Sequence, residues 1–191
     1  MLRGAPANTP AVPPTPARQI DISVDEPFEA LVSEAWLVRV MECALRAALP
    51  AEQPGQVGLL ITGDATVQEL NREYRGLDEV TDVLSFSATH AGHWEGDEPP
   101  EDEGEDLPFP DFVLPPEELP PLGEVIVSYP QTERQAEQRG EPVERELALL
   151  LVHGVLHLVG HDHLEPEETE LMQARERVAL AEIFPAEGVA G

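Results

Sequence analysis

The sequence predicts a fold that mixes α and β structure, either α/β or α+β, with a small mixed β-sheet and one apolar helix packed centrally. Two observations carry this prediction. Short segments with the hydrophobic pattern of strands interleave with segments of helical periodicity along most of the chain. The most apolar helical segment, residues 143–159, also carries two histidines at helical spacing. At 191 residues, the chain suits one domain with a sizeable core.

The first half of the chain supplies two strands and two helices. Residues 20–24 alternate apolar and polar side chains, which predicts a half-buried strand. Residues 33–49 repeat apolar side chains at helical spacing and end at Pro50, and residues 57–62 form a short apolar strand. Asp64 is expected to cap a helix that runs to Tyr74.

The second half supplies two more strands and three helices. The strands are expected over residues 83–86 and 124–128. A polar helix over residues 131–139 ends at Gly140, and the apolar helix 143–159 follows it. A last helix begins at Pro166, with acidic residues in its first turn, and runs to about Phe184.

Two segments fall outside this pattern. Residues 1–19 are rich in Pro, Ala and Thr and are expected to form a disordered tail, which leaves residues 20–185 as the folded domain. Residues 88–121 are acidic and rich in Pro, with no Lys or Arg. This second segment is expected to be a solvated insertion between two strands rather than a separate domain.

The composition narrows the class of protein. The formal net charge is −27, which would normally argue against a polyanionic partner. No apolar run is long enough to span a bilayer, and the N-terminus lacks the apolar segment of a secretory signal. A single cysteine, Cys43, excludes an internal disulfide. We therefore expect a cytoplasmic protein with no membrane partner.

The basic residues are unusual because all eleven are arginines. Any phosphate contact must therefore come from a guanidinium, which binds phosphate oxygens in pairs. Seven of the arginines lie between the first helix and the histidine-bearing helix, and they are expected to form a local positive cleft. They are Arg39, Arg46, Arg72, Arg75, Arg134, Arg139 and Arg145.

The histidines near the C-terminus predict a metal site. His153 and His157 are four residues apart on one helical face, so their imidazoles can reach one point. Gly160 allows the chain to leave the helix and double back, which would bring His163 to the same point. If the helix continued instead, His161 would replace His163. Three imidazoles with an open fourth position are typical of a catalytic zinc, so we expect one Zn²⁺ per chain.

The spacing of these histidines also matches the ligand pattern of the metzincin proteases, His-Glu-x-x-His-x-x-Gly-x-x-His. In those enzymes the glutamate after the first histidine is the general base. Here that position is Gly154, which has no side chain to accept a proton. Peptide hydrolysis by that mechanism is therefore not expected, and another substrate class is indicated.

A second motif, residues 71–86, places an amide, an arginine, hydroxyls and carboxylates between a helix and a strand. Taken alone, Arg75 could offset the helix dipole, and Asp78 or Asp82 could bond within the turn. Together with residues 122–128 and 153–163, however, this motif resembles the YbeY family of bacterial endoribonucleases, over about residues 20–185. Two departures are His161, where an aromatic such as Tyr is common, and the longer, more acidic 88–121 segment.

The resemblance implies an α+β fold in which a small mixed sheet packs with a central metal-bearing helix and flanking helices. It implies that His153, His157 and His163 bind the metal and that Arg75 acts in RNA cleavage. The implied activity is zinc-dependent, single-strand-specific cleavage in 3′-end maturation of small-subunit (16S) ribosomal RNA and in ribosome quality control. The implied partners are ribosomal RNA, small-subunit proteins and a ribosome-assembly GTPase, and not DNA.

The mechanism expected from this resemblance has a zinc that activates water or polarises a phosphoryl oxygen, while Arg75 neutralises charge on the phosphodiester. The attacking group is either water or the RNA 2′-hydroxyl. Asp162 either orients a ligand imidazole or caps the turn. The alternatives are another metal-dependent hydrolase with this histidine cage, and a ribosome-assembly factor whose zinc is structural.

Overall fold

The structure is a computed structural model that describes residues 18–89, 118–161 and 165–185. Its four strands are β1 (Arg18–Val24), β2 (Gly55–Thr62), β3 (Val83–Ser87) and β4 (Pro121–Ser128). The helices are the short 3-10 helix η1 (Glu26–Phe28) and the α-helices α1 (Glu34–Ala48), α2 (Asp64–Arg75), α3 (Tyr129–Arg139), α4 (Val143–Leu158) and α5 (Pro166–Ile183). The expected combination of a small mixed sheet with several helices is confirmed.

The sheet has the order β1-β2-β4-β3. Strands β1, β2 and β4 run parallel, and β3 pairs antiparallel with β4 at one edge. Side chains alternate between the two faces of each strand, as β-structure requires. Val125 and Val127 of β4 belong to the large core on one face, whereas Ile126 belongs to a small cluster with Val67 and Leu84 on the other.

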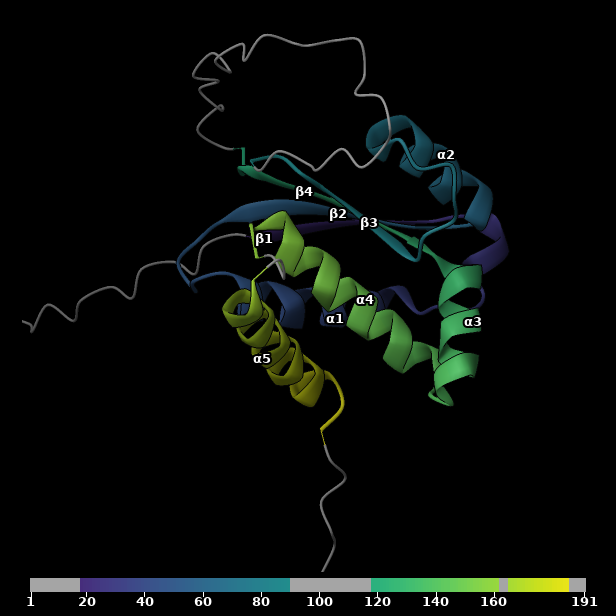
Figure 1. Ribbon diagram of the computed structural model, residues 1–191. Helices are drawn as coiled ribbons and strands as arrows, with labels where there is room; N and C mark the ends of the chain where they lie inside the picture. The colour runs from purple at the N-terminus through teal and green to yellow at the C-terminus, as the bar shows by residue number, and fades with distance from the viewer. Residues whose placement is uncertain (1–17, 90–117, 162–164, 186–191) are drawn as a thin grey trace, which may run out of the picture.

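The helices divide unequally between these two faces (Figure 1). Helix α2 covers one face alone, over the small cluster, while α1, α3, α4 and α5 lie on the other side of the sheet. Helix α4 contacts α1, α3 and α5 as well as β3 and β4. It is therefore the central helix of the main layer, and its apolar side chains Leu147, Leu151 and Leu156 are fully buried.

The element boundaries differ little from those expected. Strand β1 begins at Arg18, because Arg18 and Gln19 pair with β2, so these two residues belong to the sheet rather than to the tail. Gly63, not Asp64, occupies the cap position of α2. The side chain of Asp64 instead accepts hydrogen bonds from Ser128 and Arg134. Almost all of the predicted tail and insertion lies outside the described residues.

Within the described residues, no helix is both long and apolar enough to cross a membrane.

Candidate metal centre

Two imidazoles converge on one face of α4. His153 and His157 are one helical turn apart, and their Nε2 atoms lie 3.0 Å from each other. The rings meet edge to face, with centroids 4.6 Å apart and an interplanar angle of 75°. Both side chains are half-buried, so they face a partly enclosed space rather than open solvent. The sequence prediction that these two nitrogens meet at a single point is thus met by the geometry.

A carboxylate from another helix holds the first of these imidazoles. Oε1 of Glu176, on α5, lies 2.9 Å from Nδ1 of His153. The side chain of Glu176 is only 15 % exposed. With Nδ1 donating its proton to this carboxylate, a neutral His153 carries its lone pair on Nε2, the nitrogen that faces His157. Carboxylates bonded in this way commonly fix the ring orientation of metal-binding histidines.

The geometry of this pair fits a zinc ion. Two nitrogens that bind one tetrahedral zinc at about 2.0 Å are about 3.3 Å apart, close to the 3.0 Å between the two Nε2 atoms here. Within the ranges that the structure describes, no three His, Cys, Asp or Glu side chains come together as a metal cluster. His163, the predicted third ligand, and Asp162 lie outside the described residues, so the full ligand set remains a prediction.

The alternative third ligand, His161, lies elsewhere. Helix α4 ends at Leu158, and Gly160 has a left-handed φ of 84°, so the chain turns where the sequence predicted. The imidazole of His161 is set near Ala48 of α1 and Arg175 of α5. Burial lowers the pKa of His161, and the positive charge of Arg175 lowers it further. Among the described residues, His161 forms no three-residue metal cluster with His153 and His157.

Gly154 has a packing role that the sequence could not reveal. A Cβ atom at this position would lie 2.7 Å from Cγ1 of Val125 and 3.1 Å from Oγ of Ser85. Real Cβ atoms essentially never approach that closely, so the helix backbone here rests directly on β4 and β3. A glutamate, as in the metzincin pattern, would not fit. The absence of a protease base at this position is thus built into the packing between helix and sheet.

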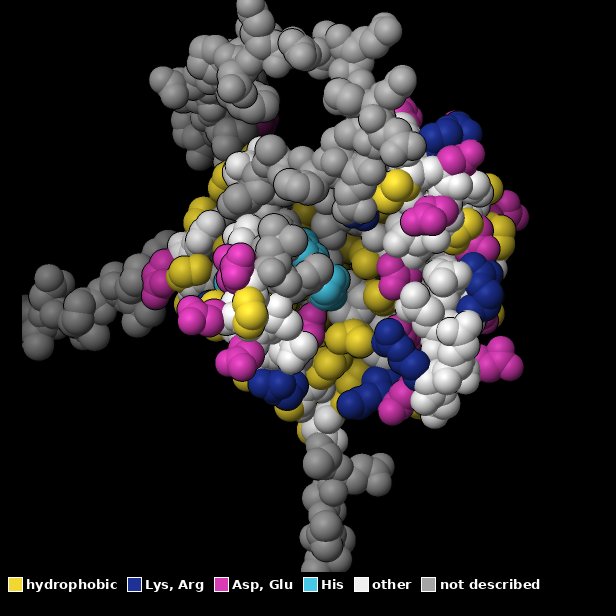
Figure 2. Space-filling model, viewed as in Figure 1, with side chains coloured by type: hydrophobic (Ala, Val, Ile, Leu, Met, Phe, Trp, Pro, Cys, Tyr) yellow, Lys and Arg dark blue, Asp and Glu magenta, His cyan; other side chains and the backbone are white. Residues whose placement is uncertain are grey.

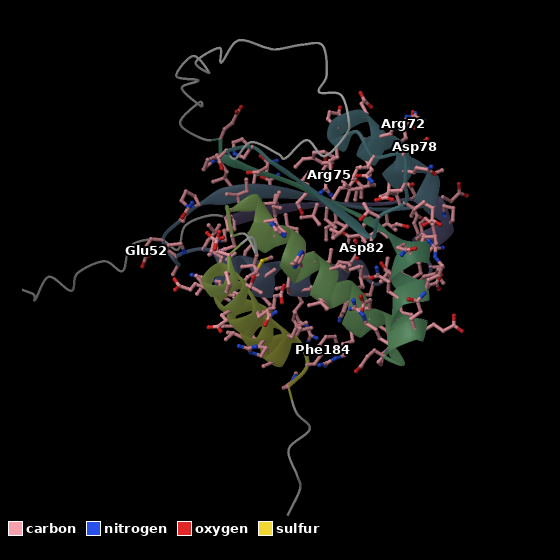
Figure 3. All side chains as sticks on the ribbon, viewed as in Figure 1. Glu52, Arg72, Arg75, Asp78, Asp82 and Phe184 are labelled. Atoms are coloured by element: carbon pink, nitrogen blue, oxygen red, sulfur yellow. The ribbon has the colours of Figure 1, made fainter. Side chains whose placement is uncertain are left out.

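The second motif forms the connection from α2 to β3. Arg75 is the last residue of α2, and Gly76 follows it with a left-handed φ of 77°. The buried Asn71 donates from Nδ2 to the carbonyl of Glu79, which fixes this connection to the helix. Figure 3 shows Arg75, Asp78 and Asp82 along it, with Asp82 at the end nearer to α4. The structure thus places Arg75 on α2 and the histidines on α4.

A pocket of about 310 Å³ adjoins the histidine pair. It lies between α3, α4 and α5, and His153 and Glu176 belong to its lining. Asp82 also belongs to the lining, and Leu149, Leu150 and Met172 supply apolar walls. Figure 2 shows the histidines in a hollow of this face, with hydrophobic side chains beside them.

Four of the seven arginines expected to form a positive cleft are paired with carboxylates. Arg134 pairs with Asp64, Arg139 with Glu146, Arg145 with Glu141 and Arg46 with Glu182. The four arginines lie on α1, α3 and α4, and Figure 2 shows basic side chains in separate places interleaved with acidic ones. Each of these four positive charges is offset by a nearby carboxylate, a pairing that the sequence alone does not reveal.

Glu176 is the residue that sequence reasoning missed. It lies 23 positions after His153, in a helix with several acidic residues, so no local spacing distinguishes it. In the structure it lies one turn after Met172, a fully buried residue on the same helical face, and this position, which the sequence does not show, explains why the carboxylate needs a partner.

Comparisons with known proteins support one family. Residues 19–183 match the family model described as endoribonuclease YbeY. A protein named endoribonuclease YbeY from Dehalococcoides mccartyi strain CBDB1 is 43 % identical over 166 residues, which are 86 % of this chain and 93 % of that protein. Another of the same name, from Roseiflexus sp. strain RS-1, is 40 % identical over 164 residues, with 85 % and 91 % covered. The solution structure of a Thermotoga maritima protein has a similar fold, with a TM-score of 0.53, 21 % identity, and 86 % and 89 % of the two chains covered.

Proposed function

Because the chain belongs to the YbeY family, whose named members are endoribonucleases, we propose that it cleaves single-stranded RNA with the aid of one bound zinc ion. Its proposed role is 3′-end maturation of small-subunit ribosomal RNA and ribosome quality control. Its partners are then ribosomal RNA, small-subunit proteins and a ribosome-assembly GTPase. This role places the protein in the cytoplasm, and the single cysteine, Cys43, is compatible with that reducing compartment.

One observation carries the proposal, which is the 3.0 Å separation of the two Nε2 atoms beside a carboxylate-held imidazole. At this separation the two rings can share a hydrogen bond when no metal is bound, and the same convergence would let both Nε2 lone pairs bind one ion. His153, His157 and His163 would hold the zinc, and Glu176 would keep His153 in the correct orientation. A zinc ion bound there polarises a phosphoryl oxygen or a water molecule.

Protein side chains supply the rest of the proposed mechanism. We propose that Arg75 binds a non-bridging phosphate oxygen and neutralises the charge that develops during cleavage, because a guanidinium offers paired cationic donors that match phosphate oxygens. The α2–β3 connection positions it, since Asn71 and Gln68 fix that segment through Glu79 and Asp78. The attacking group is either water or the RNA 2′-hydroxyl, and the cleavage products distinguish the two.

The test is cleavage of a labelled single-stranded RNA by the purified protein, with and without a chelator. We expect cleavage that the chelator stops and added zinc restores. Arg75→Ala should keep its zinc and cleave about 10²-fold more slowly, the usual scale for losing one such stabiliser. Arg72→Ala is the matched control, because it removes a neighbouring charge from the same helix.

Zinc that is present without RNA cleavage would contradict the proposal and favour an assembly factor with a structural metal. Wild-type rates in Arg75→Ala would remove that residue from the mechanism.

A further inference from the structure

Most side chains that line the pocket beside the histidine pair take no part in the proposed metal binding. Its volume of about 310 Å³ is at the lower end of the ~300–1,000 Å³ found for small-molecule sites. His153 belongs both to its lining and to the histidine pair. Whatever occupies the pocket is therefore next to the atoms that react at the proposed metal site.

The charges in the pocket argue against a phosphate as its occupant. Asp82 and Glu176 are both in the lining and both carry carboxylates. The arginine of the lining, Arg139, is bonded to both oxygens of the buried Glu146, at 2.7 and 2.8 Å. A dianionic or monoanionic phosphate would meet two negative charges and a cation that is already paired, so repulsion would exclude it.

The same lining suits a flat, neutral group with hydrogen-bond donors. Leu149, Leu150 and Met172 supply apolar contacts of the kind that hold the faces of extruded bases. Gln173 and Thr169 add polar atoms at the α5 side. A nucleobase combines an apolar face with a polar edge, and proteins that read single-stranded RNA bind it in this way.

Asp82 gives the pocket a fixed acceptor. Its Oδ1 accepts from the backbone N–H of Val83 at 2.8 Å and from Oγ1 of Thr81 at 3.2 Å, and its Oδ2 accepts from Nε2 of Gln135 at 3.0 Å. These three bonds hold the carboxylate in place. An ionised carboxylate has about four lone-pair sites, so it can still accept a bond from an exocyclic amino group.

We propose that this pocket binds one unpaired base of the RNA, that of a nucleotide next to the cleaved phosphodiester, and that Asp82 favours a base with an amino group. Adenine, cytosine and guanine have that group, and uracil does not. This inference rests on the proposed function, because the substrate of the adjoining site must be RNA. It adds a specificity site that the histidines and Arg75 do not supply.

The test uses short single-stranded RNAs in which each position around the cut is made abasic in turn. For the wild-type protein, loss of the base at one position beside the cut should lower kcat/KM about 5–150-fold, equivalent to ~1–3 kcal/mol per bound base. Leu149→Ala and Gln173→Ala should shrink that dependence, since each removes part of the pocket wall. Gln138→Ala, an exposed amide on α3, should leave it unchanged.

Asp82→Asn sharpens the test. In the wild type, uracil at the sensitive position should be cleaved more slowly than adenine, cytosine or guanine. In the variant that preference should fall, because an amide presents both a donor and an acceptor. Zinc content should match the wild type in every variant. Melting curves show whether any variant has a folding defect, Asp82→Asn above all, because its amide cannot accept all three of the bonds that hold the Asp82 carboxylate.

Two results separate failure of this inference from failure of the proposed function. Zinc-dependent cleavage that is indifferent to every abasic position would overturn the base pocket and leave the endoribonuclease proposal standing. If no RNA is cleaved, fluorescence anisotropy with the same RNAs still decides the pocket. Binding that weakens at one abasic position, less so in Leu149→Ala, would support it, and binding that ignores every base would overturn it.

Discussion

Helix α4 takes part in two acid–base pairs of different character, one toward each end. Near its N-terminus, Glu146 is only 3 % exposed and accepts two hydrogen bonds from Nη1 of Arg139 on α3. Toward its C-terminus, His153 meets Glu176 of α5 at 2.9 Å. Arg139, His153 and Glu176 all belong to the lining of one pocket, so both pairs border the same space.

The two pairs show how a polar contact that stabilises the fold differs from one that can bind a ligand. In the first pair both oxygens of the buried carboxylate face one guanidinium, which is how proteins compensate a buried charge. In the second pair one ring nitrogen meets the carboxylate, and the other is directed at a second imidazole. The first pair is closed on itself, whereas the second presents a nitrogen to a shared point. We infer that only the second is built to bind a ligand.

The largest expected effect comes from the helix–sheet contact that places the histidine pair. Gly154→Glu should cost at least about 3 kcal/mol of unfolding free energy, because the side chain would overlap Val125 and bury a charge. Urea unfolding measures this, with Gln138→Glu on α3 as the control for added charge. A stable Gly154→Glu protein that cleaves casein would restore the protease hypothesis and contradict the packing described here.

The Arg139–Glu146 pair should contribute to the stability of the fold and not to zinc binding. Arg139→Ala leaves Glu146 buried without its cation, which should cost about 1–3 kcal/mol of stability and leave the zinc content unchanged. Arg145→Ala is a matched control, since its pair with Glu141 is 3.6 Å apart and both side chains are about half exposed. That control should cost less than about 0.5 kcal/mol. Loss of zinc in Arg139→Ala would show that the two pairs are not independent.

The His153–Glu176 pair should contribute to zinc binding and little to the stability of the fold. Glu176→Gln should weaken zinc binding about 10–100-fold, the usual effect of removing a carboxylate behind a metal-binding histidine. The melting temperature of the metal-free protein should change little. Competition with a chromophoric chelator measures the affinity, and Glu170→Gln, an exposed change on the same helix, is the control. Unchanged affinity in Glu176→Gln would mean that the 2.9 Å contact only packs α5 against α4.

The smallest effect on stability is expected from an exposed ion pair, Arg134 and Asp64. The guanidinium of Arg134 lowers the pKa of Asp64, and Ser128 adds a further hydrogen bond to the same carboxylate. A lowered carboxyl pKa stabilises the fold above the usual value near ~3.9 and loses that stabilisation as pH falls through the lowered pKa. Because the side chains are 45 % and 34 % exposed, the effect should be below about 1 kcal/mol.

Urea unfolding at pH 7 and at about pH 2.5, for the wild type and for Asp64→Asn, tests this smallest prediction. The difference between the two proteins should be present at pH 7 and shrink at low pH. A difference that grows on acidification would mean that the Arg134 contact does not stabilise the charged form of Asp64.

The elements of the fold could be read from the sequence because each has a local pattern. The positions of β2, α3 and α4 came from hydrophobic period and from glycines such as Gly140, and they differ from the structure by at most two residues at either end. The strand order could not be read in this way. Strand β4 lies between β2 and β3 through contacts far apart in the chain, and no local pattern encodes such pairing.

The candidate site likewise has features that local sequence spacing predicts and features that only tertiary packing creates. The i, i+4 spacing of His153 and His157 is a local signal, and the structure brings their nitrogens together. Glu176, the pocket and the close approach of Gly154 to Val125 arise from tertiary packing, which gives no spacing to read. The pairing of Arg134 and Arg139 could not be predicted for a related reason, because the sequence shows cations but not the carboxylates that fold against them.

Zinc stoichiometry, measured by elemental analysis of the purified protein and of single histidine variants, tests the central claim most directly. We predict about one zinc per chain in the wild type and in His161→Ala, and almost none in His153→Ala, His157→Ala and His163→Ala, all of which should remain folded by circular dichroism. Full zinc content in His153→Ala or His157→Ala would contradict the claim that the histidine pair on α4 is a metal centre.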